Sequence, residues 1–72
     1  MSDNPTLAIR VNGEPRQVSG GASVAAMLAE LGVDAKKVAV ERNLEIVPRS
    51  LLGDVVVEDG DAFEIVRFVG GG

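Results

Sequence analysis

One segment of the sequence repeats apolar residues with the period of an α-helix, and this segment limits which folds the chain can adopt. In "SVAAMLAELG" the apolar residues that share one helical face are Val24, Met27, Leu28 and Leu31. Ser23 can cap the first turn, and Gly32 can end the helix in the left-handed conformation. A single short helix covers only one face of a sheet, so the other face must meet water or a partner.

The residues before this helix predict a β-hairpin. The period of a half-buried strand is visible in the alternation of Leu7, Ile9 and Val11 with Ala8, Arg10 and Asn12. The pair Asn12-Gly13 tolerates positive φ at both positions, which is a strong short-range signal for a hairpin turn. Residues 16–19 can then return as the second strand.

The residues after the helix predict two short strands. Residues 38–41 and 45–47 have strand character and are joined through residues 42–44. Pro48 ends the second strand, because proline has no N–H to donate to a sheet.

The segment "RSLLGDVVVEDGDA", residues 49–62, is the least regular part of the sequence. Its acidic residues do not follow the spacing of an EF-hand calcium loop, so no metal site is predicted. Within it "EDGD", residues 58–61, is interpreted as a solvated turn, because Asp and Gly both favour turns.

A last strand is predicted over residues 62–69. Alternation puts Phe63 and Ile65 on one face, and Val66 and Phe68 on the other. Apolar residues on both faces indicate a central strand or a second contact surface. Val66 and Phe68 are therefore predicted to bind a partner, although partial burial by a loop would also explain them.

These elements predict an α+β fold of the ubiquitin-like β-grasp type, a mixed sheet packed on one main helix. Residues 1–69 are predicted to form the domain, and the glycines of residues 70–72 are predicted to form a flexible C-terminal tail. Folding alone does not require three glycines after a strand. A linker or a cloning remnant is the plain alternative explanation for them.

Composition narrows the possible functions. The chain has no Cys and no His, so it lacks thiolates, disulfides, and the commonest metal ligand and general base. It is therefore not expected to be an enzyme. Its net charge of -4 argues against binding nucleic acid. No signal peptide or membrane span is recognised, so a cytoplasmic protein with no membrane partner is expected.

Four stretches in the same order resemble those of the ubiquitin-like sulfur carriers, and most closely the ThiS family of thiamine biosynthesis. They are "VAVERN" at residues 38–43, "EIVPRS" at 45–50, "EDGD" at 58–61 and "EIVRFVGGG" at 64–72. One departure is Leu44, where family members often carry Gly after the asparagine of the turn. A primed two-residue turn would put Leu44 at positive φ, so the sequence leaves the turn type open.

The resemblance implies a function for the glycine tail. An E1-like adenylating enzyme of the ThiF type, using ATP and Mg, would adenylate the carboxylate of Gly72. A sulfur donor such as a cysteine desulfurase would then displace AMP, and the thiocarboxylate would deliver sulfur to thiazole synthase of the ThiG type. The chain itself would bind no cofactor and would be a monomer when free. Gly70 and Gly71, which lack Cβ, would let the tail enter a narrow channel.

Three alternatives stay open at the level of the sequence. The small subunit of molybdopterin synthase also ends in two glycines, although usually after a proline-containing segment that "FVGGG" does not match. A ubiquitin-like modifier joined to target lysines would share the adenylation step. A binding module with an inert tail would keep its activity when the tail is removed.

Overall fold

A computed structural model describes residues 5–68 of the chain. Its elements follow the predicted order of hairpin, helix, two short strands, loop and final strand. They are β1 (Thr6–Val11), β2 (Glu14–Ser19), α1 (Val24–Glu30), the 3-10 helix η1 (Ala35–Lys37), β3 (Val38–Arg42), β4 (Glu45–Ile46), the 3-10 helix η2 (Arg49–Leu51) and β5 (Ala62–Arg67).

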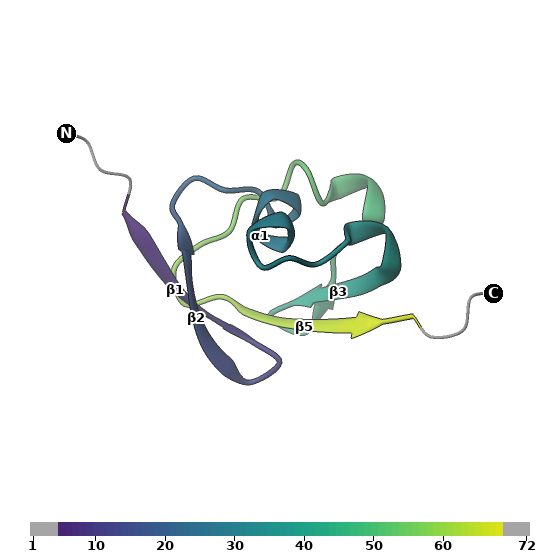
Figure 1. Cartoon of the computed structure of the whole chain (residues 1–72), viewed down its shortest axis with the longest axis horizontal. Coiled ribbons are helices and arrows are strands. Elements are labelled where there is room, and N and C mark those ends of the chain that lie inside the picture. Colours follow the sequence, from purple (N-terminus) through teal and green to yellow (C-terminus); the bar gives the residue numbers. More distant parts are fainter. Residues whose placement is uncertain (1–4, 69–72) are drawn as a thin grey trace.

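The strands form one mixed sheet in the order β2-β1-β5-β3-β4. The central strand β5 is parallel to β1 and antiparallel to β3, whereas both hairpin pairs are antiparallel. Helix α1 covers one face of the sheet (Figure 1). The predicted α+β fold is therefore confirmed, and the last strand is central, which is one of the two possibilities that the sequence left open. In the part of the chain that the structure describes, no helix is long and apolar enough to cross a membrane.

The core lies between α1 and the covered face of the sheet. From the helix, Val24, Met27 and Leu28 are fully buried as predicted, whereas Leu31 is only partly buried at the edge of the core. The sheet contributes Ile9, Val18, Val38, Val40 and Phe63. Alternation along the strands therefore identified the buried face correctly, including Phe63, which is 1% exposed.

Both hairpin turns have positive φ at their two central residues. Asn12 and Gly13 have φ of 51° and 83°, as expected for a primed turn. Asn43 and Leu44 have φ of 52° and 72°, which answers the question that the sequence left open. A leucine in this region is strained by roughly 1 kcal/mol or more. The Leu44 side chain is 88% exposed, so packing within residues 5–68 does not offset the strain.

The segment between η2 and β5 does more than connect them, because it closes the N-terminal end of α1. The amides of Val24 and Ala25 donate to the carbonyls of Val55 and Leu52, each at 2.8 Å. The predicted cap is also present, since the hydroxyl of Ser23 accepts from the amide of Ala26 at 3.0 Å. The segment also adds Leu52 and Val57 to the core. Its fixed conformation follows from these long-range contacts.

The prediction that residues 58–61 form a solvated turn is wrong for Asp61. Glu58, Asp59 and Gly60 are exposed, but Asp61 is only 5% exposed. Its carboxylate accepts from Arg42 Nε at 2.9 Å, from Asn43 Nδ2 at 3.0 Å and from the amide of Glu58 at 2.9 Å. Asp61 therefore ties the loop before β5 to the turn between β3 and β4.

Candidate functional site

The predicted site residues Gly70, Gly71 and Gly72 lie outside the described residues. The site is therefore built from the end of β5, where the chain leaves the sheet. The amide of Phe68 donates to the carbonyl of Lys37 at 2.9 Å, which continues the pairing of β5 with β3 beyond Arg67. Phe68 thus has a fixed backbone position and serves as the root of the glycine tail.

Arg49 holds the side chain of Phe68 from a distant part of the sequence. Its guanidinium carbon lies 6.0 Å from the centre of the Phe68 ring, within reach of a cation–π interaction. The same guanidinium donates from Nη1 to the carbonyl of Ala35 at 2.8 Å and from Nη2 to that of Val38 at 3.4 Å. Arg49 therefore connects η2, η1, β3 and the tail root.

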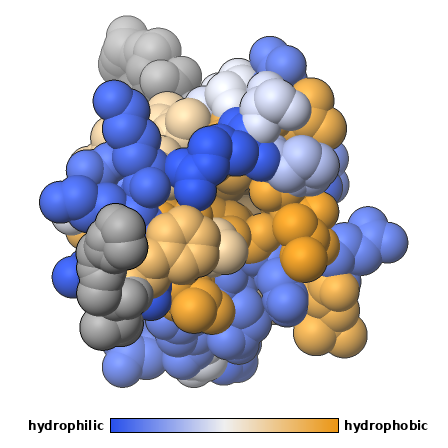
Figure 2. All heavy atoms as spheres, turned by 90° about the vertical axis from the view of Figure 1, so that its right-hand side faces the viewer, coloured by the Kyte–Doolittle hydropathy of each residue, from blue (hydrophilic) through white to orange (hydrophobic). Residues whose placement is uncertain are grey.

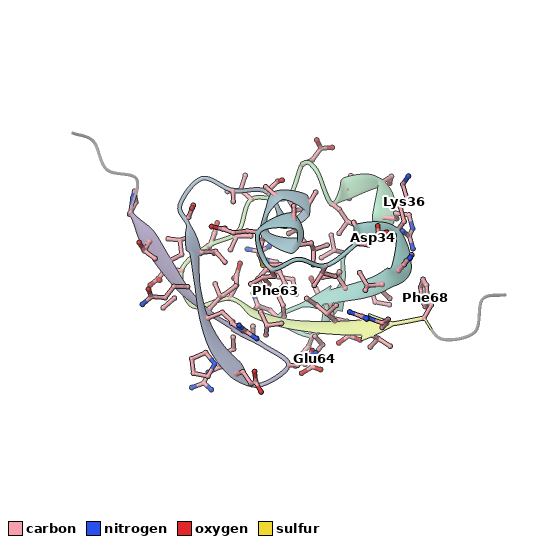
Figure 3. The ribbon with its side chains drawn as sticks, viewed as in Figure 1. Asp34, Lys36, Phe63, Glu64 and Phe68 are labelled. Atoms are coloured by element: carbon pink, nitrogen blue, oxygen red, sulfur yellow. The ribbon has the colours of Figure 1, made fainter. Side chains whose placement is uncertain are left out.

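The two predicted partner-binding residues are both exposed. Val66 is 59% exposed and Phe68 is 56% exposed. Val66 is opposite Ala39 in the sheet, on the face that α1 does not cover. Phe68 lies beyond the end of β5, and Figure 3 shows its ring turned toward the side of Asp34 and Lys36, away from Glu64. The alternation that placed Phe68 beside Val66 therefore ends with the strand.

Apolar side chains continue from these two residues onto the edge of the sheet. Ile46 is 72% exposed, and a shallow hollow beside it is lined by Ala39, Val47, Pro48 and Arg49 among others. We call Ala39, Ile46 and Val66 the apolar patch, and Phe68 borders it through Arg49, which lines the hollow and lies over the Phe68 ring. Figure 2, which looks onto this end of the molecule, shows apolar surface bordered by hydrophilic side chains.

At the opposite end of β5, the charged side chains of Asp61 and Arg42 stabilise the fold. Burial alone raises the pKa of Asp61, but hydrogen bonds from Glu58, Arg42 and Asn43, with the charge of Arg42, outweigh it. The net effect lowers the pKa of Asp61 below its ordinary value. Within residues 5–68, no group of three or more acidic side chains is placed to hold a metal ion.

Sequence reasoning missed Arg49 and Asp61. Arg49 follows a proline in a segment without periodicity, so no local signal indicates that it reaches Phe68, 19 positions later. For Asp61 a weak signal existed. Asn43 in the predicted turn and Asp61 in the predicted loop both have side chains that can form hydrogen bonds with the backbone or with each other.

Comparison with known proteins points to one family. A family model of the ThiS family matches residues 9–72. The crystal structure of the thiamine biosynthesis protein ThiS from Geobacter metallireducens is similar with a TM-score of 0.77 and 39% sequence identity. That match covers 92% of this chain and all of the other chain.

Two of the curated relatives differ in name and in length. The chain is 39% identical over 62 residues to the sulfur carrier protein ThiS of Thermus thermophilus, a match that covers 86% of this chain and 95% of the relative. It is 61% identical over 66 residues to a thiazole synthase of Paramagnetospirillum magneticum, covering 92% of this chain. The chain spans only 20% of the length of that thiazole synthase.

Proposed function

The chain belongs to the ThiS family, and from this premise we propose that it carries sulfur for thiamine biosynthesis as a thiocarboxylate on Gly72. The observation that carries the proposal is the family match through residue 72, which includes the glycine tail. The exposed apolar patch at the tail root supports it, since a carrier must present both a surface and a reactive end to its partners.

The proposed chemistry takes place on the terminal carboxylate, because the chain has no thiol that could carry the sulfur. A carboxylate oxygen is a poor leaving group until it is joined to AMP. Attack of the Gly72 carboxylate on the α-phosphorus of ATP forms the acyl adenylate and releases pyrophosphate. A sulfur nucleophile then adds to the acyl carbon and expels AMP. Hydrosulfide gives the thiocarboxylate directly, whereas the terminal sulfur of a donor persulfide gives an acyl disulfide, which a thiol reductant cleaves to the thiocarboxylate and a disulfide. Without cysteine the chain cannot carry the sulfur as a persulfide.

The ATP site and the magnesium ion belong to an E1-like adenylating partner of the ThiF type in this proposal. The chain is a carrier and not an enzyme, and the sulfur comes from a donor such as a cysteine desulfurase. The composition supports this division of labour, because the chain has neither His nor Cys for acid–base or nucleophilic catalysis.

The proposed acceptor of the sulfur is a thiazole synthase of the ThiG type. A protein named thiazole synthase contains, within 20% of its length, a segment that is 61% identical to this chain. In that relative the similar segment and the remainder of the protein belong to one polypeptide. This arrangement supports a partnership between the present chain and a thiazole synthase.

The deciding experiment is the intact mass of the 72-residue chain after incubation with ATP, Mg, an adenylating enzyme and a sulfur source. We expect one oxygen to be replaced by sulfur, and digestion should place the change at Gly72. A known carrier treated in parallel is the positive control. An unchanged mass in conditions that load the control would refute the proposal, and adducts to protein lysines would favour the modifier function.

Changing Phe68 to Asp should weaken binding to the adenylating partner by about 2 kcal/mol or more, because it places a charge in an interface centre. The free energy of unfolding should change little, since the side chain is 56% exposed. Titration calorimetry and thermal unfolding measure the two effects. Leu44→Asp is the matched control, because it adds the same charge to an exposed leucine at the other end of β3. Equal losses in both variants would contradict docking at Phe68.

A further inference from the structure

Positive charge gathers at the root of the glycine tail. The chain has a net charge of -4 and only seven Lys and Arg residues. Four of them lie on η1, on η2 or at the end of β5, and we call these four the basic collar: Lys36, Lys37, Arg49 and Arg67. An acidic protein that concentrates its cations at one end has a strongly uneven surface potential.

The contacts of the collar place it directly around Phe68. Lys37 accepts the amide of Phe68 through its carbonyl, and Arg49 lies over the Phe68 ring. Arg67 is the neighbour of Phe68 in the chain, and it lines one hollow together with Lys37 and Asp34. Lys36 projects from the same end of the molecule in Figure 3.

The fold does not neutralise these cations within residues 5–68. The ion pairs in that part of the chain join Arg16 to Glu14 and Arg42 to both Glu58 and Asp61. Asp34 is the acidic neighbour of the collar, and its carboxylate accepts the amide of Lys36 at 2.9 Å. The three ion pairs thus lie elsewhere, and all four collar residues are exposed.

We propose that the basic collar steers the tail root onto an acidic surface of the adenylating partner, around the opening that receives the tail. This inference rests on the proposed function and adds the chemistry of the partner surface. Opposite charges on the two surfaces raise the rate of productive encounter and orient the carrier with its tail forward.

Two features of the chain favour a protein surface over a nucleotide or a nucleic acid. A net charge of -4 opposes binding to a polyanion. Four residues separate Phe68 from the end of Gly72, a reach of up to about 14 Å, so a nucleotide held at Gly72 can lie beyond the collar.

The inference commits to the adenylating partner because, in the proposed function, that enzyme is the first to receive the tail, and the collar surrounds the root of the tail. Electrostatic steering helps most when a carrier must find a separate enzyme by diffusion.

The test compares two double variants with equal net charge. Each Lys→Glu or Arg→Glu reversal changes the charge by two units, so Lys36→Glu/Lys37→Glu and Arg10→Glu/Arg16→Glu both carry -8 instead of -4. The control residues lie on the β1–β2 hairpin, away from the end of β5 (Figure 1). Thermal unfolding confirms that each variant folds.

Stopped-flow association with the adenylating enzyme is measured at about 0.02 M and about 0.5 M salt. The increase in salt shortens the electrostatic screening length several-fold. At low salt we expect the collar variant to associate about tenfold more slowly than wild type, and the control variant to associate less than about threefold more slowly. This difference between the two variants should shrink at high salt. Equal rates for the two variants would overturn the inference.

The end point of loading separates this inference from the proposed function. With long incubation and excess enzyme, the collar variant should still gain sulfur on Gly72, because only its encounter is slowed. If wild type gains none, the proposed function fails whatever the association rates are. If wild type loads and the two variants associate alike, only the steering role fails.

Discussion

Appending one alanine after Gly72 is expected to reduce sulfur loading at least a hundredfold while the domain stays folded. The addition moves the terminal carboxylate by up to about 3.6 Å along the chain. A displacement of about 1 Å already costs on the order of a hundredfold when reacting atoms must be held in line. The carboxyl carbon of Gly72 would then sit in an amide and could no longer be adenylated.

Replacing Gly71 by Val tests the same end of the chain without moving the carboxylate. A β-branched side chain restricts the backbone and adds bulk next to the reacting residue. ATP–pyrophosphate exchange by the adenylating enzyme should therefore fall for both variants. An alanine added before Met1 is the matched control, since it lengthens the chain equally. Undiminished exchange by both tail variants would mean that the glycines are a spacer and that Gly72 does not react.

The same measurements bear on the rival functions. If both tail variants lose exchange while thermal unfolding is unchanged, a binding module with an inert tail is excluded. Loss of exchange alone does not separate a sulfur carrier from a ubiquitin-like modifier, because both are adenylated. Intact mass separates them, since a carrier gains sulfur and a modifier forms adducts with lysines.

Features decided by neighbouring residues could be predicted from the sequence. The cap at Ser23, the buried face of α1 and the Asn12-Gly13 turn all depend on residues within a few positions of one another. The mixed β-grasp sheet then follows, because one helix and several short strands have few ways to share a core. The predicted strand bounds differ from the observed ones by one or two residues, as fraying ends allow.

Features decided by distant contacts were not predictable in the same way. The segment after η2 lacks periodicity, yet it closes the start of α1 through bonds to Val24 and Ala25. Leu44 adopts positive φ because hydrogen bonds to residues outside the turn fix the conformation of the turn. The amide of Asn43 donates to the carbonyl of Ala62 at 2.7 Å, and its Oδ1 accepts from the amide of Ala62 at 2.9 Å. These contacts outweigh the preference of a single side chain.

The candidate site was predictable in part and for a different reason. Alternation found Val66 and Phe68, and both are exposed. It could not show that Phe68 turns toward η1, because that direction depends on Arg49 from another element. The role of Gly72 came from the resemblance of several stretches to a family and not from periodicity. It therefore stays a prediction for the mass and exchange measurements.

Asp61→Asn is expected to lower the free energy of unfolding at pH 7 by about 2 to 4 kcal/mol, because it breaks a buried ion pair. The substitution keeps the shape of the side chain but replaces one acceptor oxygen by an NH₂ group. The carboxylate now accepts from three donors, on Arg42, Asn43 and Glu58. An amide cannot satisfy all three, so at least one donor loses its partner.

The loss should depend on pH in a direction that the structure determines. The pKa of Asp61 is lowered in the folded chain, so its carboxylate stabilises the fold fully above the ordinary pKa that the group has when unfolded. That contribution disappears as the pH falls through the lower, folded pKa. The difference between wild type and Asp61→Asn should therefore be largest near neutral pH and should shrink in acid. Urea unfolding at pH 7 and at about pH 3 measures it.

Glu58→Gln is the matched control for this prediction. Glu58 also lies near Arg42, at 3.7 Å, but its side chain is 74% exposed. An exposed pair contributes less than about 1 kcal/mol, so the control should remain close to wild type. Folded Asp61→Asn should still be adenylated, because Asp61 lies before β5 and the tail root lies after it. A stability loss no greater than that of Glu58→Gln, or one that grows in acid, would show that Asp61 is not an ionised link between the loop and the turn.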